Sequence, residues 1–185
     1  MQVVVPVRSF LGMARLADHV SPETRCRLST TMADRLVASA REAELPVTVV
    51  TDDEAVAAWA DKNGLEVAVD PGEGLNAAAS RTIANLETWA VVHADLPLVT
   101  PADLEAVLVA LGRVRHTVLS PSHDGGTSVV AAMTNTFPFS YGPGSFRRHL
   151  AALQGQADVV TRRGLSIDID GPHHLAVARR LGALP

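Results

Sequence analysis

The chain has 185 residues and a formal net charge of −4, with 47% hydrophobic and 19% charged residues. That length favours a single domain over residues 1–185 with a sizeable core. The acidic balance, without a basic stripe, argues against nucleic acid as a main partner, and no apolar run reaches the ~18 residues of a membrane span. The single cysteine, Cys26, excludes an intrachain disulfide and favours a cytoplasmic location.

Short β-branched runs alternate with helical segments along the whole chain. In chain order we expect strand 3–5, helix 22–43, strand 47–50, helix 55–61, strand 65–69, helix 75–86, strand 89–92, helix 101–111, strands 117–119 and 128–133 around a Gly125-Gly126 turn, helix 145–153, strand 165–169 and helix 172–181. This alternation predicts a three-layer α/β fold, in which a mostly parallel sheet carries helices on both faces.

Carboxylates follow two of the expected strands. Asp95 comes directly after strand 89–92, and Asp168 and Asp170 stand at i and i+2 near the end of strand 165–169. Ligands of α/β sheets gather beyond the carboxyl ends of the strands, and Mg²⁺ is bound through carboxylates and phosphate oxygens. The three aspartates therefore indicate a metal and phosphate site. The alternative for Asp95 is that it caps the helix that begins near Pro101.

The loop after the first strand carries two cations, Arg8 and Arg15, ahead of a long helix. Backbone amides and cations in such a loop can surround a nucleotide phosphate chain. The spacing of a Walker A loop is absent. A surface loop with two solvated arginines is the alternative.

Three further segments are suited to anions or nucleosides. Asn76 follows a glycine-containing loop at a helix start, where its amide can reach a base or a ribose. Thr127 follows the Gly125-Gly126 turn. Gly144 and Ser145 precede a helix and can present amides and a hydroxyl to a phosphate. A turn or a helix cap explains the first two equally well.

The seven histidines are scattered through the sequence. His93 stands two residues before Asp95, where it could line the same cleft. The others, including His123, His173 and His174, lack the spacing of metal ligands. We therefore expect them to be packed or surface residues.

Over nearly its whole length the chain resembles the guanylyltransferases that activate 2-phospho-lactate or phosphoenolpyruvate in the biosynthesis of the deazaflavin coenzyme F(420). The resemblance rests on several short motifs that occur in the same order and with the same spacing. They are Val5-Pro6-Val7-Arg8 with Ala14-Arg15-Leu16, Leu75-Asn76, His93-Ala94-Asp95-Leu96-Pro97-Leu98, Gly126-Thr127, Tyr141-Gly142-Pro143-Gly144-Ser145-Phe146 and Ile167-Asp168-Ile169-Asp170.

The resemblance implies a nucleotidyltransferase fold of the nucleotide-diphospho-sugar transferase type. It also implies a reaction in which a substrate phosphate attacks the α-phosphorus of GTP and pyrophosphate leaves. By the same resemblance Asp95, Asp168 and Asp170 would hold Mg²⁺, and Arg8 and Arg15 would face the triphosphate and act with Asp95 in catalysis.

The resemblance assigns the substrates to further residues. Thr127, Gly144 and Ser145 would bind the phosphate or carboxylate of the acceptor, and Asn76 would bind the nucleoside. The expected partners are GTP and a small phosphorylated carboxylic acid, and a homodimer remains an open assembly state.

The chain departs from the family pattern on its nucleotide side. The family usually has lysine at the positions of Arg8 and Met13, and an asparagine-containing segment in place of Ser128-Val129-Val130. Arg8 keeps a positive charge, whereas Met13 does not. These departures leave a second hypothesis open, that of a non-catalytic relative that binds a phosphorylated acid or serves as a partner subunit.

Overall fold

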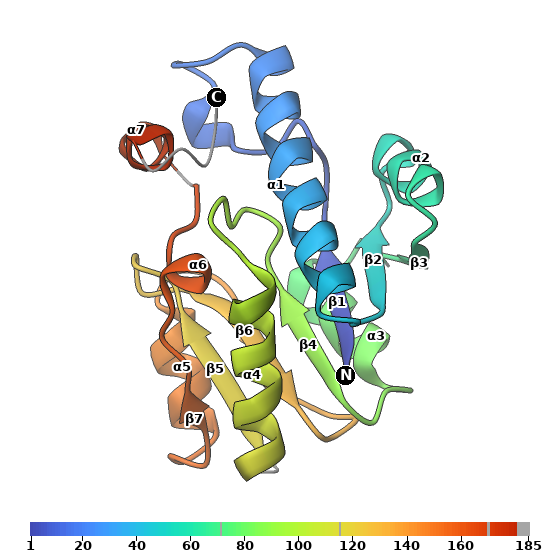
Figure 1. The fold of residues 1–185 in the computed structure, drawn as a ribbon, viewed down its shortest axis with the longest axis vertical. Coiled ribbons are helices and arrows are strands. Elements are labelled where there is room, and N and C mark those ends of the chain that lie inside the picture. Colours follow the sequence, from blue (N-terminus) through green and yellow to red (C-terminus); the bar gives the residue numbers. More distant parts are fainter. Residues whose placement is uncertain (71, 115, 170, 181–185) are drawn as a thin grey trace.

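The computed structural model describes residues 1–180 except 71, 115 and 170. A seven-stranded sheet has the order β3-β2-β1-β4-β6-β5-β7 (Figure 1). Its strands are β1 (Gln2–Pro6), β2 (Val47–Thr51), β3 (Glu66–Val69), β4 (Trp89–Val92), β5 (Thr117–Pro121), β6 (Thr127–Ala132) and β7 (Asp158–Val159). The helices are α1 (Pro22–Glu42), α2 (Glu54–Lys62), α3 (Leu75–Ile83), α4 (Pro101–Val114), α5 (Ser145–Ala152), α6 (Arg163–Ser166) and α7 (Pro172–Arg180), together with a 3₁₀ turn, η1 (Ala14–Leu16).

The sheet is mostly parallel, as expected. Strands β1, β2, β3 and β4 pair in parallel, and so do β5 and β7. Strand β6 runs antiparallel to both of its neighbours, β4 and β5. The predicted hairpin around Gly125-Gly126 is therefore confirmed, and its second strand lies between two strands that run in the same direction.

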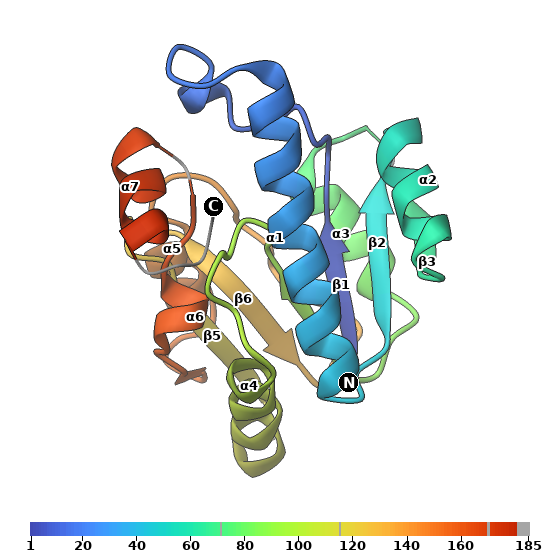
Figure 2. The ribbon, with the colours of Figure 1, turned by 45° about the horizontal axis from the view of Figure 1, so that its top comes forward.

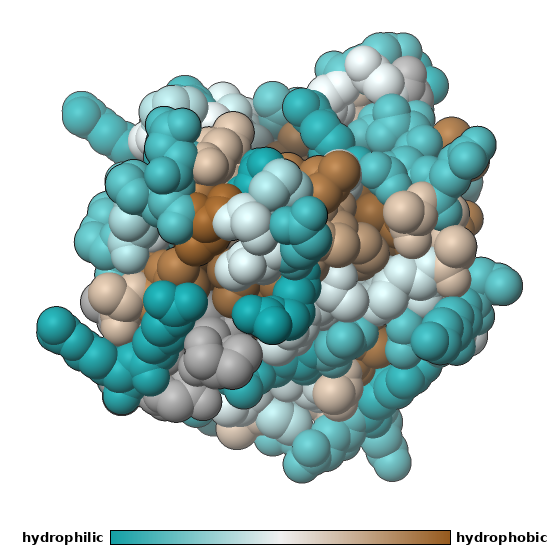
Figure 3. Space-filling model, turned by 90° about the horizontal axis from the view of Figure 1, so that it is seen from above, coloured by the Kyte–Doolittle hydropathy of each residue, from teal (hydrophilic) through white to brown (hydrophobic). Residues whose placement is uncertain are grey.

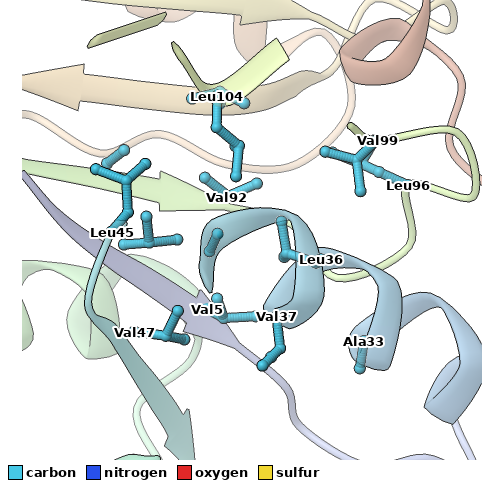
Figure 4. Close-up of a cluster of buried hydrophobic side chains, with 14 of the residues drawn as sticks. Val5, Ala33, Leu36, Val37, Leu45, Val47, Val92, Leu96, Val99 and Leu104 are labelled. Carbon is cyan, nitrogen blue, oxygen red and sulfur yellow. The ribbon is translucent and has the colours of Figure 1, made fainter. Parts of the chain in front are cut away.

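Helices cover both faces of the sheet, which confirms the three-layer arrangement (Figures 1 and 2). Along β1, Val3 and Val5 belong to one core cluster and Val4 to the other, as the period-2 alternation of a strand requires. The first cluster contains Leu36 of α1, shown among its neighbours in Figure 4, and residues of α2 and α4. The second contains Ile83 of α3, with residues of α5 packed against it.

The start of α4 settles the alternative reading of Asp95 as a helix cap. Asp103 accepts hydrogen bonds from the backbone N–H and the hydroxyl of Thr100, at 3.0 and 2.7 Å. In return, the N–H of Asp103 donates to the carbonyl of Thr100. This reciprocal pair is a helix-capping arrangement. Asp95 lies in the preceding loop and is left for another role.

The expected strand at 165–169 is wrong. Residues 163–166 form the short helix α6, and residues 167–169 are extended without joining a ladder. The backbone of this stretch makes single bonds to two different loops, Ser166 O accepting from His123 N and Ile169 N donating to Asp95 O. Strand β7 was not predicted, because two exposed residues give no apolar pattern. Residue 181 of the expected last helix lies outside the described residues.

Among the described residues, every helix is too short or too polar to cross a lipid bilayer.

Two glycines of the α4–α6 region differ sharply in their surroundings. A Cβ on Gly164 would lie 2.8 Å from the carbonyl oxygen of Leu98 and would also collide with Asp103, whereas Gly112 has open space. We expect Gly164→Ala to lower the free energy of unfolding by about 1–3 kcal/mol through overpacking. The matched change Gly112→Ala, within α4, should raise it by about 0.5–1 kcal/mol. Urea denaturation of the two variants measures both, and equal effects would contradict the packing of α6 against α4.

Candidate active site

A cavity of about 290 Å³ opens at the carboxyl ends of β1, β2 and β4. The strand order puts these ends at one edge of the sheet, where α/β proteins bind ligands. In Figure 3, which views this end of the molecule, apolar atoms are exposed in the middle and polar atoms surround them. The lining comprises Pro6, Val7, Arg8, Ser9, Phe10, Gly12, Met13, Ser29, Met32, Val50, Asp70, Leu75, His93, Ala94 and Asp95.

The loop after β1 contributes one side of this cavity. Of its two predicted cations, Arg8 lines the cavity, whereas Arg15 lies on η1 with an exposed side chain. Met13 also lines the cavity, with a left-handed backbone (φ 57°) at the start of η1. Arg25 of α1 holds the loop by donating from Nη1 to the carbonyls of Leu11 and Gly12. Because Arg25 lies in a helical run, the sequence pattern gave no sign of this contact.

Asp95 and the segment that carries Asp168 lie side by side. The N–H of Ile169 donates to the carbonyl of Asp95 at 3.0 Å, and Asp95 lines the cavity. A backbone hydrogen bond thus brings the Asp168 segment to the Asp95 loop, and the shared binding of a metal by these aspartates stays a prediction. Asp170, the third predicted ligand, lies outside the described residues.

The surroundings of Asp168 favour a bound cation. Burial and the nearby Asp124 carboxylate together raise the pKa of Asp168 above its ordinary value. The Nδ1 atom of His123 lies 2.9 Å from Asp168 Oδ1 and opposes that rise. Two carboxylates in a half-buried region repel each other, and a divalent cation would relieve this repulsion.

His93 lines the cavity, as expected from its place before Asp95. Burial lowers its pKa, although the charges of Asp168 and Asp124 act in the opposite direction. Its Nε2 atom is buried and has no hydrogen-bond partner among the described residues. The centroid of the ring lies 5.0 Å from that of Tyr141. The buried hydroxyl of Tyr141 also has no hydrogen-bond partner in the part of the chain that the structure describes. Burial raises the pKa of Tyr141, so both rings are neutral near pH 7.

Thr127 and Ser145, the predicted acceptor-binding residues, contact each other inside the protein. Ser145 Oγ donates to Thr127 Oγ1 at 3.1 Å, and Thr127 Oγ1 lies 3.0 Å from His149 Nδ1. His149 Nε2 accepts from the backbone N–H of Ser140, so in a neutral ring the proton is on Nδ1. Both hydroxyls and His149 are almost fully buried. In this conformation they hold the 140–145 loop in place.

The 140–145 loop is also fixed from outside. Arg148 donates to the carbonyl of Ser140 at 2.7 Å and to that of Pro143, and a Cβ on Gly144 would lie 3.9 Å from its Nη1. Gly144 has a left-handed backbone (φ 69°), which suits glycine at the start of α5. Asn76 Oδ1 accepts from the N–H of Tyr141 at 2.7 Å, which ties α3 to the same loop.

The predicted roles of the site residues thus fall into two groups. The structure places Arg8 and Asp95 in the cavity and brings the Asp168 segment to Asp95. Binding of the acceptor by Thr127, Gly144 and Ser145, and of the nucleoside by Asn76, stays a prediction, as does the contact of Arg15 with phosphate. The sequence analysis missed the supporting roles of His149, Arg148 and Arg25, because their partners lie in other elements or loops, outside the helix that carries each residue.

The buried His149 should make stability pH-dependent. Burial, with the charge of Arg148, lowers its pKa from 6.5 to about 4. The unfolded chain therefore takes up a proton near pH 6.5 that the folded chain takes up only near pH 4. We expect the free energy of unfolding to fall by about 2–3 kcal/mol from this residue as the pH decreases through that window. Urea denaturation at several pH values tests this, and the variant His149→Gln should lack that part of the dependence. Parallel pH profiles of the two proteins would contradict it.

Comparison with known proteins identifies the family of the chain. A family model described as guanylyl transferase CofC like matches residues 1–177. A phosphoenolpyruvate guanylyltransferase of Rubrobacter xylanophilus is 37% identical, with 94% of this chain and 90% of that protein aligned. A protein of the same name from Chloroflexus aggregans is 32% identical, with 94% of each aligned.

Solved structures support the fold at low sequence identity. A crystal structure of a nucleotide-diphospho-sugar transferase, so named provisionally, from Desulfovibrio desulfuricans has a TM-score of 0.83 at 12% identity and covers 98% of this chain and 87% of that one. A CMP:2-keto-3-deoxy-manno-octonic acid synthetase in complex with CTP has a TM-score of 0.54 at 14% identity, covering 98% and 97%. The expected fold is confirmed, and the chain belongs to the CofC-like guanylyl transferase family.

Proposed function

We propose that the protein transfers GMP from GTP to the phosphate of phosphoenolpyruvate, or of the related acid 2-phospho-lactate. An oxygen of the acceptor phosphate attacks the α-phosphorus of GTP, the bond from that phosphorus to the β-phosphate oxygen breaks, and pyrophosphate leaves. The observation that carries the proposal is the meeting of the Asp168 segment with Asp95 beside the cavity. The relatives named phosphoenolpyruvate guanylyltransferase, and the coenzyme F(420) pathway to which the resemblance points, support this acceptor class.

The residues present fit a bound Mg²⁺. Asp95 and Asp168 offer carboxylate oxygens, which Mg²⁺ prefers, and burial together with the negative charge of Asp124 raises the pKa of Asp168, an effect that a bound cation would offset. When bound there, the ion would neutralise phosphate charge and orient the in-line displacement. We assign Asp95 and Asp168 to this ion, and Asp170 as a third ligand from the family resemblance.

The other cavity residues bind and position the substrates. Arg8 supplies a permanent positive charge for the triphosphate at the carboxyl end of β1. The neutral ring of His93 adds no charge beside the phosphates. The loop that carries Gly144 and Ser145 is held by His149 and Arg148, so it is preorganised for an anionic acceptor.

One observation favours a second candidate, a non-catalytic binder of phosphorylated acids. Met13 lies in the cavity at the position where the family usually has lysine, so the cavity has one cation fewer than expected. We favour the enzyme because the carboxylates are assembled beside the cavity together with Arg8. Cytoplasmic residence and a homodimer also stay predictions.

Asp95→Asn should reduce the rate of pyrophosphate release by at least ~100-fold, because it removes a preorganised charge near the reacting phosphates. The assay combines purified protein, Mg²⁺, GTP and either phosphoenolpyruvate or 2-phospho-lactate. The matched control is Asp61→Asn, on the exposed side of α2, which should keep the wild-type rate.

The outcomes separate the two candidates. Release with one acceptor and not the other identifies the substrate. Wild-type activity in Asp95→Asn would contradict the role of this residue. Absence of release by folded wild-type protein, with phosphoenolpyruvate binding still measurable by calorimetry, would favour the non-catalytic binder.

A further inference from the structure

Three histidines from two distant parts of the sequence meet beside the aspartate segment. His123 lies in the turn between β5 and β6, and His173 and His174 lie in the first turn of α7. One ring nitrogen of each lies within 4.8 Å of those of the other two. His123 and His173 are exposed, and His174 is buried. The sequence analysis expected packed or surface histidines, and their burial agrees with this, but the pattern gave no sign that the three side chains meet.

The three imidazole rings are packed closely together. The Nε2 atoms of His123 and His174 are 2.5 Å apart, with their rings nearly perpendicular at a centroid distance of 4.1 Å. The rings of His173 and His174 are 3.7 Å apart. In tetrahedral Zn²⁺ sites with Zn–N near 2.0–2.1 Å, ligand nitrogens are roughly 3.3 Å apart. The Nε2–Nε2 separation of 2.5 Å is shorter than this value, so the rings of His123 and His174 have to move apart slightly to admit an ion, while the three nitrogens already lie within 4.8 Å of one another.

Metal-binding imidazoles commonly have a carboxylate beside their second ring nitrogen, and His123 has Asp168 close by, although the contact is not an aligned hydrogen bond. Its Nδ1 lies 2.9 Å from Asp168 Oδ1, which leaves Nε2 as the atom directed at His174. A carboxylate behind the imidazole fixes the tautomer and raises the basicity of the ligand nitrogen. The backbone is fixed as well, because His123 N donates to Ser166 O and His174 N donates to Gly171 O.

We propose that His123, His173 and His174 form a binding site for one divalent transition-metal ion, best suited to Zn²⁺, through three imidazole nitrogens and one open position. Imidazole nitrogens suit zinc, cobalt and nickel, whereas Mg²⁺ requires oxygen ligands. The site is therefore chemically distinct from the aspartate site, although Asp168 contacts both. The ion takes the place of the proton between His123 Nε2 and His174 Nε2, so binding releases a proton.

A metal ion here would link the turn between β5 and β6 to the first turn of α7. Leu175, the next residue of α7, packs with Leu16, Leu28 and Ile169 in a small core cluster. That cluster is the apolar contact of α7 with η1 and α1. The ion would add a second, polar attachment between α7 and His123, the residue beside Asp168. Because the ion would bind only the folded chain, it would raise the thermal stability of the protein.

The test is a titration of untagged, chelator-treated protein with Co²⁺ in the presence of excess Mg²⁺. We expect one Co²⁺ per chain, with the visible absorption of a four-coordinate ion, and displacement by Zn²⁺. His173→Ala should weaken binding by at least ~100-fold, because loss of a ligand exceeds the 10–100-fold cost of losing an outer-sphere partner. This variant is preferred to His174→Ala because His173 is exposed, so its loss leaves the fold intact.

Two further variants sharpen the test. His116→Ala removes an exposed histidine at the other end of β5 and should bind Co²⁺ as the wild type does. Asp168→Asn should keep one ion per chain with about 10-fold weaker affinity. Zn²⁺ should raise the melting temperature of the wild type and of His116→Ala, but not that of His173→Ala.

The proposal would be overturned if the wild type and His173→Ala bound Co²⁺ with equal affinity, or if the wild type bound no Co²⁺. The close pair His123–His174 would then be a direct imidazole hydrogen bond and nothing more. The titration needs no nucleotide and no acceptor, so its outcome is independent of the proposed transfer reaction.

Discussion

A single stretch, from Ser166 at the end of α6 to Ile169, joins the two loops on which the site depends. Its backbone accepts from His123 in the turn between β5 and β6 and donates to Asp95 after β4. Each bond satisfies a backbone group that would otherwise be buried without a partner. The stretch therefore carries Asp168 to a fixed place between Asp95 and His123. These two bonds bring the loop of Asp95 and the turn of His123 to the segment that carries Asp168.

The strand arrangement explains why this stretch is required. Strand β6 runs antiparallel between β4 and β5, so the loop after β4 and the turn after β5 lie at the same edge of the sheet but are separated by a strand. A later segment of the chain has to cross that gap to bring the loops together. The short helix α6 and the segment behind it provide this crossing (Figure 1).

Buried polar groups hold the 140–145 loop, the predicted binding site of the acceptor, in place. Thr127 comes from β6, Ser145 and His149 come from α5, and the Ser140 amide comes from the loop before α5. In a medium of low dielectric constant, each of these groups would be costly if it lost its partner. Because His149 is neutral, it can donate to Thr127 and accept from Ser140 at once. The position of the 140–145 loop therefore depends on His149, which reaches the predicted acceptor-binding residues only through the hydroxyl of Thr127.

The sequence by itself determined the layered α/β fold, the ends of most helices and strands, and the residue types suited to phosphate and metal. Local patterns are sufficient there, since the 3–5 and 89–92 runs are β-branched or apolar and Ser21-Pro22 marks a helix start. Tertiary structure alone decided that residues 165–169 form no strand but connect the loop after β4 with the turn after β5. The backbone hydrogen bonds of this stretch go to Asp95 and His123, which are far away in the chain. Tertiary structure also decided that His123 meets His173 and His174. Spacing rules detect ligands only within one local segment, whereas these side chains come from the turn between β5 and β6 and from α7, which packs against η1 and α1.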